Sequence, residues 1–529
     1  MAYLRLNDLL SCMCTGQFLH NLIQASLELQ YRIRLATECM DDNPSCSLGL
    51  SDRFSLLFRR QKFWRNFIYD FRVSSQTPHI ASGMYDLKPD AYLLGIASTS
   101  LPGQWSVTRG VQCAELPRTE GQKVAWSKIA VGRNVLDFGT AIEEHNLIAF
   151  LTVPELNVRG PLEIELIDFR SGSAHPKAIK STLTVQQLTE ESQEIHVNLE
   201  IVGENLALVV YHHSTEVHTV QQHNFLYLYN WKLGSLKTNP IPVQNTGLVF
   251  LAEDVLMLPI NDGRLDIYYI PPTHPPAHGQ VRLIRSFMLP RLADPSTRLR
   301  NVQCRGEPNP RGTSSFASTT RPFSTSVESS IILISFDVMY ISANWYRPFT
   351  FIVHRKALLP RSTGYPARYE ELDPLDHIIP WSDWGPSATR WFPNENIDNA
   401  FITTSCGTRW VYRPRTVPGE RRAPLVILDF NPYLVRREIA AERAERRGGP
   451  INSWNTDTAY TSLVYGTDWF STHGVFRDEV GGSLPYIEVR SKEQFEYDAV
   501  MLSEEHIIVT KGDPNNVFSV QSFECFHFG

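Results

Sequence analysis

Histidines gather in the stretch YHHSTEVHTVQQHNF, which places His212, His213, His218 and His223 close together in the sequence. Zinc needs three or four ligands that converge tetrahedrally, and the two flanks of a hairpin can bring two imidazoles together. Glu216 is a further candidate ligand, but no cysteine lies nearby. We therefore expect an exposed polar loop here, with no bound metal and no cofactor.

Motifs of the common enzyme classes are missing from the sequence. It has no GxSxG turn, no GxxxxGK[ST] phosphate loop, no GxGxxG after a strand and no HExxH helix. The adjacent carboxylates Glu143-Glu144 and Glu190-Glu191 are expected in turns that face solvent. Distant strands could still assemble an acid–base pair of the glycosidase kind, which sequence spacing would not reveal. We predict no catalytic residue and a protein that is not an enzyme.

Aromatic and arginine residues cluster in a Pro-rich region, 359–415, that is predicted to form long loops. Such residues are over-represented in binding hot spots, and loops on a rigid scaffold often carry binding sites. The predicted partner-binding residues are Trp381, Trp384, Arg390, Trp391, Trp410 and Tyr412. The alternative is that these rings fill space between tapering sheets. A basic cluster that could bind phosphate, or form an ordinary exposed loop, contains Arg413, Arg415, Arg421 and Arg422.

Composition indicates a large folded protein. Of the 529 residues, 42% are hydrophobic and 20% are charged, which excludes a disordered or fibrous chain. The net charge of -6 is a poor match for a nucleic-acid binder. Apolar runs such as 331–336 are far shorter than the ~20 residues that cross a bilayer. With no secretory signal at the start and no CxxC pair, we expect reduced thiols in the cytoplasm or nucleus.

After about residue 67 the sequence consists of short β-rich runs separated by turn residues. Three times, an acidic or Asn turn leads into an apolar strand and then a second strand, with the apolar strands starting at Leu147, Leu206 and Val255. A repeat of roughly 50–60 residues is typical of the four-stranded blades of a β-propeller. Asp262-Gly263 predicts a tight hairpin between VLMLPI and RLDIYYI. We therefore predict a mainly β fold, an irregular, WD-repeat-like β-propeller over residues 67–529, with a β-sandwich or two smaller β domains as the alternative.

A closed propeller joins its two ends so that no strand edge stays exposed. We predict that a strand within 67–95 pairs beside strands from 505–525. Insertions are expected near 271–282, 305–328, 359–400 and 437–449. The Ser/Thr-rich segment 305–328 is predicted to be a mobile loop, and 437–449 a short charged helix with Glu442 and Arg446 paired.

Residues 1–66 are predicted to form a separate, all-helical module. Apolar residues recur at three-and-four spacing from Asp8 to Leu35, with Asn7 as the expected N-cap and Gly16 dividing the pattern into two helices. A further helix is predicted over 51–66. The apolar surface is too wide for a lone helical arm, so it must pack against a partner or against the β domain.

The stretch LNDLLSCMCTGQFLHNLIQASLELQYRI resembles the second half of an F-box. The following SDRFSLLFRRQKFWRN resembles the next segment in F-box proteins of the kind expanded in mushroom-forming (basidiomycete) fungi. The resemblance covers residues 8–66 and is diffuse beyond them. In that family the F-box docks on the adaptor of an SCF-type ubiquitin ligase, and through it on cullin, while a β-rich domain selects the protein to be ubiquitinated. The resemblance thus implies a non-catalytic substrate-recognition subunit with an unknown protein target.

The apolar pattern and the resemblance together imply a set of adaptor-binding residues: Leu9, Leu10, Met13, Phe18, Leu22 and Ile23. The usual Leu-Pro-x-Glu-Ile opening of an F-box is not found before Asn7, and Gly16-Gln17 replaces the common Cys-Arg pair. Either the start lies upstream or the F-box is degenerate. The alternative function is therefore a propeller interaction scaffold with no role in ubiquitin ligation, whose helices pack on its own β domain.

Overall fold

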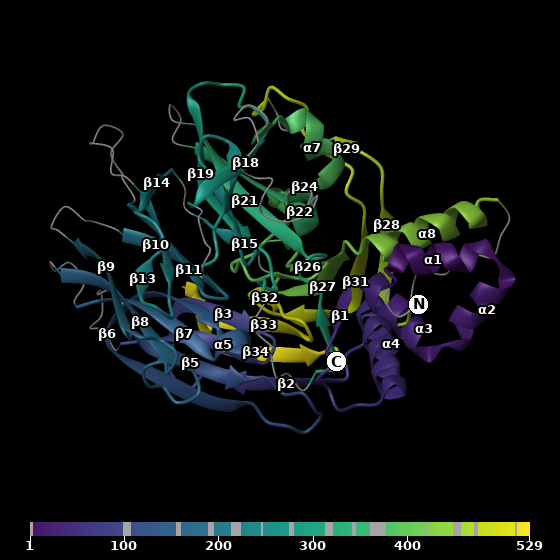
Figure 1. Cartoon of the computed structure of the whole chain (residues 1–529), viewed down its shortest axis with the longest axis horizontal. Coiled ribbons are helices and arrows are strands. Elements are labelled where there is room, and N and C mark those ends of the chain that lie inside the picture. The colour runs from purple at the N-terminus through teal and green to yellow at the C-terminus, as the bar shows by residue number, and fades with distance from the viewer. Residues whose placement is uncertain are drawn as a thin grey trace.

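The chain folds into a small helical module and a ring of β-sheets (Figure 1). The computed structural model describes residues 4–98, 107–154, 160–188, 195–212, 224–244, 247–273, 280–312, 321–340, 345–359, 377–417, 420–447, 456–469, 474–513 and 516–529. The helical module lies at one end of the molecule, at the right of Figure 1. Every helix among these residues is too short or too polar to traverse a lipid bilayer.

Four helices form the N-terminal module: α1 (Leu6–Thr15), α2 (Gln17–Ala25), α3 (Leu27–Thr37) and α4 (Leu50–Asn66). Gly16 separates α1 from α2, as predicted, but Ser26 divides the pattern again between α2 and α3, so three helices form where two were predicted. The N-cap of α1 is Arg5 and not Asn7; the Arg5 N–H donates to the Asp8 carboxylate at 3.1 Å. The helix predicted over 51–66 is confirmed as α4, which ends where Phe67 adopts a left-handed φ of 51°.

Helix α4 and a short strand attach the module to the β domain. On α4, the Trp64 ring stacks on Phe528 with centroids 4.1 Å apart, so the helix shares the core at the C-terminus. Strand β1 (Met40–Asp42) pairs antiparallel with β20 (Phe323–Thr325). The segment 1–66 is therefore not purely helical, because β1 belongs to a sheet completed by the β domain.

Seven blades make up the ring in the described part of the chain. Blade 1 contains β3 (Ala81–Lys88), β4 (Ala91–Ala97), β5 (Thr108–Glu115) and the first part of β6 (Ala125–Ala141). Blade 2 contains the second part of β6 with β7 (Leu147–Val153), β8 (Gly160–Asp168) and β9 (Thr182–Leu188). Blade 3 contains β10 (Ile195–Val202), β11 (Asn205–His212), β12 (Asn224–Asn230), β13 (Ser235–Leu236) and β14 (Ile241–Val243).

The remaining blades follow the chain to its C-terminus. Blade 4 contains β15 (Val249–Ala252), β16 (Val255–Ile260), β17 (Arg264–Tyr269), β18 (Arg282–Met288) and β23 (Ile378–Ile379). Blade 5 contains β19 (Thr297–Arg305), β21 (Ile331–Tyr340), β22 (Trp345–His354) and β24 (Thr389–Pro393). Blade 6 contains β25 (Ser405–Cys406), β26 (Arg409–Tyr412), β27 (Arg422–Asp429), β31 (Tyr486–Glu496) and β28 (Ala459–Val464). Blade 7 contains β32 (Ala499–Leu502), β33 (His506–Asp513), β34 (Asn516–His527) and β2 (Phe71–Gln76).

Blade 7 joins the two ends of the β domain. Its outer strand β2 pairs antiparallel with β34, with Phe71 opposite His527 and Gln76 opposite Ser522. This confirms the predicted pairing of a strand within 67–95 with the C-terminal strands. Each blade also contacts the next: β6 meets β10, β10 meets β15, β16 meets β19, β21 meets β25, β25 meets β32, and β34 meets β3. The ring is therefore a closed, seven-bladed β-propeller.

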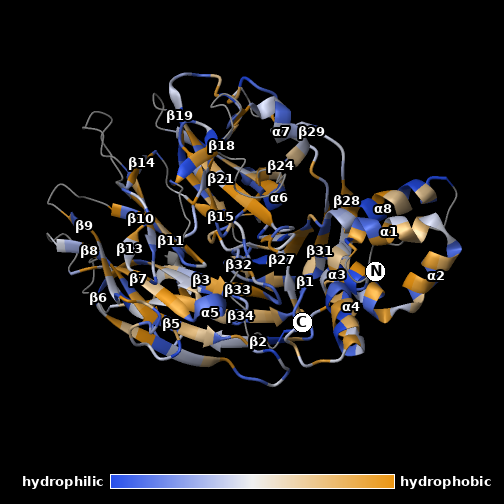
Figure 2. Cartoon of the chain, in the orientation of Figure 1, coloured by the Kyte–Doolittle hydropathy of each residue, from blue (hydrophilic) through white to orange (hydrophobic). Residues whose placement is uncertain are grey.

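Apolar side chains fill the interfaces between blades. A separate buried cluster lies between each pair of neighbouring blades, from blades 1 and 2 round to blades 7 and 1. Because a blade is covered on both faces, β7 and β16 are buried at every position, and their sequences contain no alternation of polar and apolar residues. Figure 2 shows this as strands that are largely hydrophobic in the interior of the ring.

The repeat found in the sequence corresponds to the blades. Leu147 begins β7, Leu206 lies at the start of β11 and Val255 begins β16, and these are the second strands of blades 2, 3 and 4. The predicted hairpin joins β16 to β17, and Gly263 in its turn has a φ of 93°, a conformation that favours glycine. The propeller prediction is therefore confirmed, and the β-sandwich alternative is wrong.

The insertions differ from their predictions in part. The described residues of 359–400 include α7 (Trp381–Ala388), strand β24 and a 3-10 turn (Asn394–Asn396), so this region is not simply a long loop. The charged helix predicted at 437–449 is α8, which begins earlier, at Pro432, and extends to Glu445. Arg446 does pair with Glu442, as predicted. Two further short helices are α5 (Ile142–His145) and α6 (Arg355–Leu358), and β29 (Asp468–Trp469) pairs with β30 (Gly481–Gly482).

The closing blade makes stability depend on pH. His506 on β33 is completely buried, its Nε2 lies 3.0 Å from the Pro117 carbonyl, and burial together with the nearby His527 lowers its pKa to about 4. A histidine with a lowered pKa stabilises the fold above its unfolded pKa, and this stability is lost as the pH falls. We expect the free energy of unfolding to drop by about 3 kcal/mol between pH 7 and pH 4 from this group.

Thermal unfolding followed by circular dichroism from pH 7.5 to pH 4.5 tests this expectation. The melting temperature of wild type should fall more steeply with acid than that of a His506→Gln variant. His20→Gln, at an exposed position on α2, is the matched control and should follow wild type. Parallel curves for all three proteins would contradict the assignment to His506.

Candidate functional site

The inner strands of the blades surround a central channel that contains two cavities. We call the cavity at the C-terminal ends of β3, β6 and β10 the lower cavity and the other the upper cavity. The lower cavity, of about 310 Å³, is lined by the final residues of these strands, by α5, and by parts of β20, β25 and β32. The upper cavity, of about 330 Å³, is lined by earlier residues of β3, β6, β10 and β19. Lys88 and Thr140 line both cavities, so these residues belong to the wall that divides the channel.

Five charged side chains form this wall, and we call them the channel ion cluster: Asp86, Lys88, Glu200, Arg305 and Glu307. Arg305 contacts Asp86 at 2.9 Å, Glu200 at 2.7 Å and Glu307 at 2.8 Å. Lys88 contacts Glu307 at 3.0 Å and Asp86 at 3.4 Å. The residues come from blades 1, 3 and 5, so the cluster connects non-adjacent blades across the channel.

Burial and mutual attraction set the protonation of the cluster. Burial disfavours the charge on Lys88 and on Arg305, but the surrounding carboxylates outweigh it and raise the pKa of both groups. Burial likewise opposes the charge on Asp86, yet Lys88 and Arg305 lower the pKa of this carboxyl. For Glu200 burial is the stronger effect and raises its pKa. The cluster is thus held by opposite charges that depend on one another.

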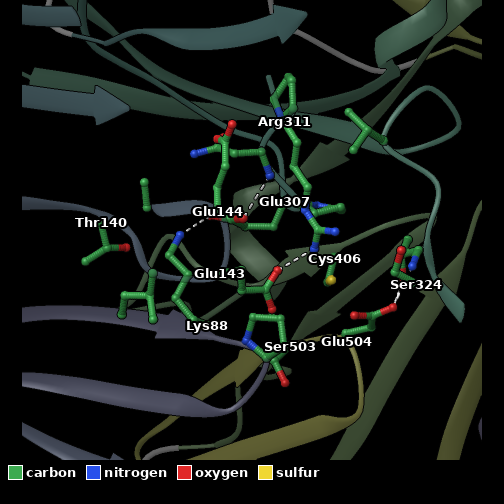
Figure 3. Close-up of a pocket in the computed structure, with 18 of the residues that line it drawn as sticks. Lys88, Thr140, Glu143, Glu144, Glu307, Arg311, Ser324, Cys406, Ser503 and Glu504 are labelled. Carbon is green, nitrogen blue, oxygen red and sulfur yellow. Dashed lines mark hydrogen bonds and ion pairs between the residues drawn. The ribbon is translucent and has the colours of Figure 1, made fainter. Parts of the chain in front are cut away.

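Two glutamates of α5 point into the lower cavity, as Figure 3 shows. Glu143 pairs with Arg311 at 2.6 Å. Glu144 accepts hydrogen bonds from the backbone N–H groups of Gly203 at 3.0 Å and Gly312 at 2.7 Å. From the sequence, this pair was predicted to lie in a turn that faces solvent. The structure corrects this prediction, because the two carboxylates bind Arg311 and Gly312 inside the channel. Each is engaged in structural contacts, so neither is the free carboxylate that an acid–base pair requires.

The segment around β20 covers the lower cavity. Arg321 is 5% exposed, and it contacts Glu504 at 3.3 Å and Glu505 at 3.2 Å. Burial opposes the charge on Glu505, but Arg321 and Arg60 lower its pKa to about 2. The prediction of a mobile loop over 305–328 is therefore wrong for 305–312 and 321–328, because buried ion pairs and the pairing of β1 with β20 hold these residues. The intervening 313–320 lie outside the described residues.

The sequence candidates for metal and acid chemistry lie mostly outside the described residues. His213, His218, His223 and the pair Glu190-Glu191 belong to segments that the structure does not describe, and only the backbone of His212 is described, at the end of β11. Within the described ranges, no group of three or more His, Cys, Asp or Glu side chains is arranged to hold a metal ion.

The predicted partner-binding aromatics are core residues. Four tryptophans of the set are buried in the interfaces between blades 4 and 5 and between blades 5 and 6: Trp381, Trp384, Trp391 and Trp410. Arg390 is also buried, with 2% of its surface exposed. Tyr412 is half-buried beside Trp410, with ring centroids 5.2 Å apart. Their burial contradicts the predicted partner surface and supports the alternative, that large rings fill the gaps between tapering blades.

The basic cluster near residue 413 is divided by the fold. Arg413 is buried, contacts Asp398 at 2.7 Å and donates to the Tyr497 carbonyl. Arg415, Arg421 and Arg422 are exposed. The four guanidinium groups therefore do not form one phosphate site.

The predicted adaptor-binding residues separate into a core and a surface. Leu9 and Ile23 are buried with Leu29 in the core of the module, so they cannot contact an adaptor in the folded protein, and the prediction is corrected for these two positions. Met13 is half-buried against the same core. Leu10, Phe18 and Leu22 are exposed by 37%, 78% and 46%, and we call these three side chains the helical apolar face.

The channel ion cluster was not predicted from the sequence. The available signal was weak: Asp86 and Glu200 lie within strands that already mix polar and apolar residues. Such a position is as consistent with an outward-facing residue as with a channel-facing one, since the direction of a side chain depends on which strand is innermost in its blade.

Comparison with known proteins finds likeness in structure alone. No family model matches the sequence, and neither does any curated protein. The WD40 domain of coronin from Toxoplasma gondii is 10% identical, with 80% of this chain and 86% of that chain covered and a TM-score of 0.34. The Cps50 (Swd1) β-propeller domain of Myceliophteria thermophila is 9% identical, with 86% and 99% covered and a TM-score of 0.37. The WD40 β-propeller domain of Doa1 is 9% identical, with 87% and 96% covered and a TM-score of 0.29.

Loss of Arg305 should destabilise the channel. In an Arg305→Leu variant, Asp86, Glu200 and Glu307 would lose the guanidinium that all three contact. Because a buried charge without its partner is costly, we expect the free energy of unfolding to fall by about 3–5 kcal/mol. Denaturant titration followed by tryptophan fluorescence measures the change.

Arg298→Leu provides the control on the same strand, since Arg298 is exposed. Its effect should stay within about 0.5 kcal/mol of wild type. A loss below 1 kcal/mol in Arg305→Leu, measured against this control, would show that the cluster does not support the ring.

Proposed function

We propose that the chain is a non-catalytic substrate-recognition subunit of an SCF-type ubiquitin ligase. The helical module docks on the SCF adaptor, and through it on cullin, while the propeller binds the protein to be ubiquitinated. The observation that carries this proposal is the helical apolar face, three exposed apolar side chains on a module that already has a core of its own.

The surroundings of this face favour a protein partner. Residues 9–27, which span most of α1 and all of α2, contain no acidic or basic side chain other than His20. A Phe18 ring that is 78% exposed adds nothing to the buried core of the module. An apolar, uncharged helical surface of this kind is a typical docking surface for another protein. The resemblance of residues 8–66 to an F-box identifies the expected partner as the SCF adaptor.

Helix α4 supports the proposal by fixing the module to the propeller. Its Trp64 stacks on Phe528, and its Arg60 donates to the Glu504 carbonyl at 2.6 Å. Gln61, also on α4, accepts a hydrogen bond from Arg409 at 2.6 Å. A rigid connection of this kind would hold a bound target at a fixed distance from an adaptor, which a recognition subunit requires.

The same packing also favours the alternative function. Because α4 is covered by the β domain, part of the module already has its partner within the chain, as expected of a propeller scaffold that has no role in ubiquitin ligation. The exposed face on α1 and α2 distinguishes the two functions, since the scaffold has no use for it.

Retention of the chain on immobilised fungal SCF adaptor tests the proposal. A Phe18→Asp, Leu22→Asp double variant should lose at least about tenfold in retention, because two charges would be buried in an apolar interface. Both side chains are exposed, so the melting temperature of the variant should match that of wild type.

Ile179→Asp is the matched control, because Ile179 is 75% exposed and lies in the connection between β8 and β9, away from the module. It should bind as wild type does. Equal retention of the double variant and wild type, or no retention of folded wild type, would overturn adaptor docking and favour the scaffold.

A further inference from the structure

The upper cavity is built by irregular positions of the inner strands. The pairing register shifts in β3 between Ala81 and Tyr85, in β6 between Val135 and Asp137, and in β19 between Arg300 and Gln303. All three strands line the cavity at or beside these shifts. A β-bulge turns a side chain away from the direction that regular pairing would give it. Three blades therefore depart from regular pairing around one cavity.

Charge in the upper cavity is unbalanced. Lys88 and Arg305 are the two cations of its wall, and both are already engaged by Asp86 together with Glu200 or Glu307. Two cations thus serve three carboxylates within the channel ion cluster. Of these carboxylates Asp86 and Glu200 line the upper cavity, and Asp137 is a third carboxylate in its lining.

Asp137 has an unused hydrogen-bonding oxygen. Its Oδ1 accepts a hydrogen bond from the adjacent Phe138 N–H at 2.8 Å. Within the described residues, its second oxygen has neither a hydrogen bond nor an ion pair, and the half-buried side chain lines the cavity. Burial, together with the carboxylates of Asp86 and Glu200, raises its pKa to about 7. A cation that enters the cavity would stabilise the ionised form of the Asp137 carboxyl, so this side chain favours cation binding.

The other walls of the upper cavity are aromatic, and they favour a ligand that has a chain of methylene groups attached to its cationic group. Tyr85, Phe138 and Tyr211 line the cavity. The Tyr211 ring stacks on His196 at 5.3 Å between centroids, and the Tyr85 hydroxyl accepts a hydrogen bond from the Ile402 N–H at 2.6 Å, so both rings are held in place. Aromatic faces attract cations and pack against the methylene groups of long side chains.

We propose that the upper cavity binds a lysine or arginine side chain of a protein segment, with Asp137 as the acceptor of its charge. An anion is disfavoured because carboxylates outnumber cations in the wall. A metal ion is disfavoured because no three ligand side chains converge within the described residues. A volume of about 330 Å³ accommodates one long side chain and leaves the rest of the segment at the end of the channel.

This inference deepens the proposed function, because it names the chemistry of the target that the propeller would select. It rests on that function only for the source of the segment. Binding of a peptide to the isolated full-length chain requires no adaptor. The Phe18→Asp, Leu22→Asp variant should therefore bind such peptides as wild type does, which separates failure of this inference from failure of adaptor docking.

Selection from a peptide library tests the inference. Random decapeptides without cysteine are selected on the full-length chain and sequenced, and the strongest binder is then measured by fluorescence anisotropy. We expect lysine or arginine to be enriched at one position, and an Asp137→Asn variant to bind the peptide at least about tenfold more weakly. Glu115→Gln, which changes an exposed carboxylate on β5, should leave the affinity unchanged.

A pH series gives a second readout that does not depend on the variant alone. Since Asp137 must be ionised to bind a cation and its pKa is raised to about 7, the affinity of wild type should fall about tenfold from pH 8 to pH 6. Asp137→Asn should show a flatter profile, and a slope that remains is expected from Glu200, which lines the same cavity and whose pKa is raised by burial. Melting curves at each pH identify loss of folding.

Three outcomes would overturn the inference. These are selection of peptides without a basic residue or of no peptide at all, unchanged affinity in Asp137→Asn, and displacement of the selected peptide by spermidine at equal concentration. The last would identify a site for free polyamines and not for a protein segment.

Discussion

The pairing of β2 with β34 is the constraint on which the rest of the structure depends. Five of the seven blades are formed by contiguous or nearly contiguous chain, and blade 4 adds only the short β23 from the chain of blade 5. Blade 7, however, needs a strand from before blade 1. Without it, β34 would expose an edge of unpaired backbone groups, and the apolar cluster between blades 7 and 1 would lose the packing of Val73. Helix α4 and the final residues pack together at this junction, so closure of the ring also fixes the helical module.

Closure has a consequence for charge. When the blades form a ring, their inner strands converge, and side chains that would face solvent in an isolated blade come together in the channel. Asp86, Glu200 and Arg305 belong to different blades, and Arg305 pairs with both carboxylates only when the ring brings these blades together. The channel ion cluster satisfies these groups by mutual pairing, whereas Asp137 forms no ion pair with any residue in the described part of the chain. The same convergence that stabilises the channel thus creates its binding chemistry.

The helical module combines a part that is fixed to the ring and a part that carries the exposed helical apolar face. Helix α4 is held by aromatic stacking and by ion pairs to the ring, whereas α1 and α2 pack on one another and on α3. Under the proposed function, this division would let one surface hold an adaptor while the propeller holds a target, with no movement between the two. The lower cavity is lined in part by β1 of the helical module and by its partner strand β20. The module therefore contributes directly to the wall of the channel.

The sequence by itself determined the elements that depend on local pattern: the helices of residues 6–66, the hairpin at Gly263, the blade repeat and the need to join the ends of the ring. Only the tertiary structure decided which side chains face the channel, the core or solvent. Ile23 and Phe18 look alike in a helical pattern, yet one is buried and the other exposed. The tryptophans of 381–410 were predicted to form a partner-binding surface, but they fill the interfaces between blades. The physical reason is that burial and pairing are set by contacts between residues far apart in the chain, which periodicity cannot specify.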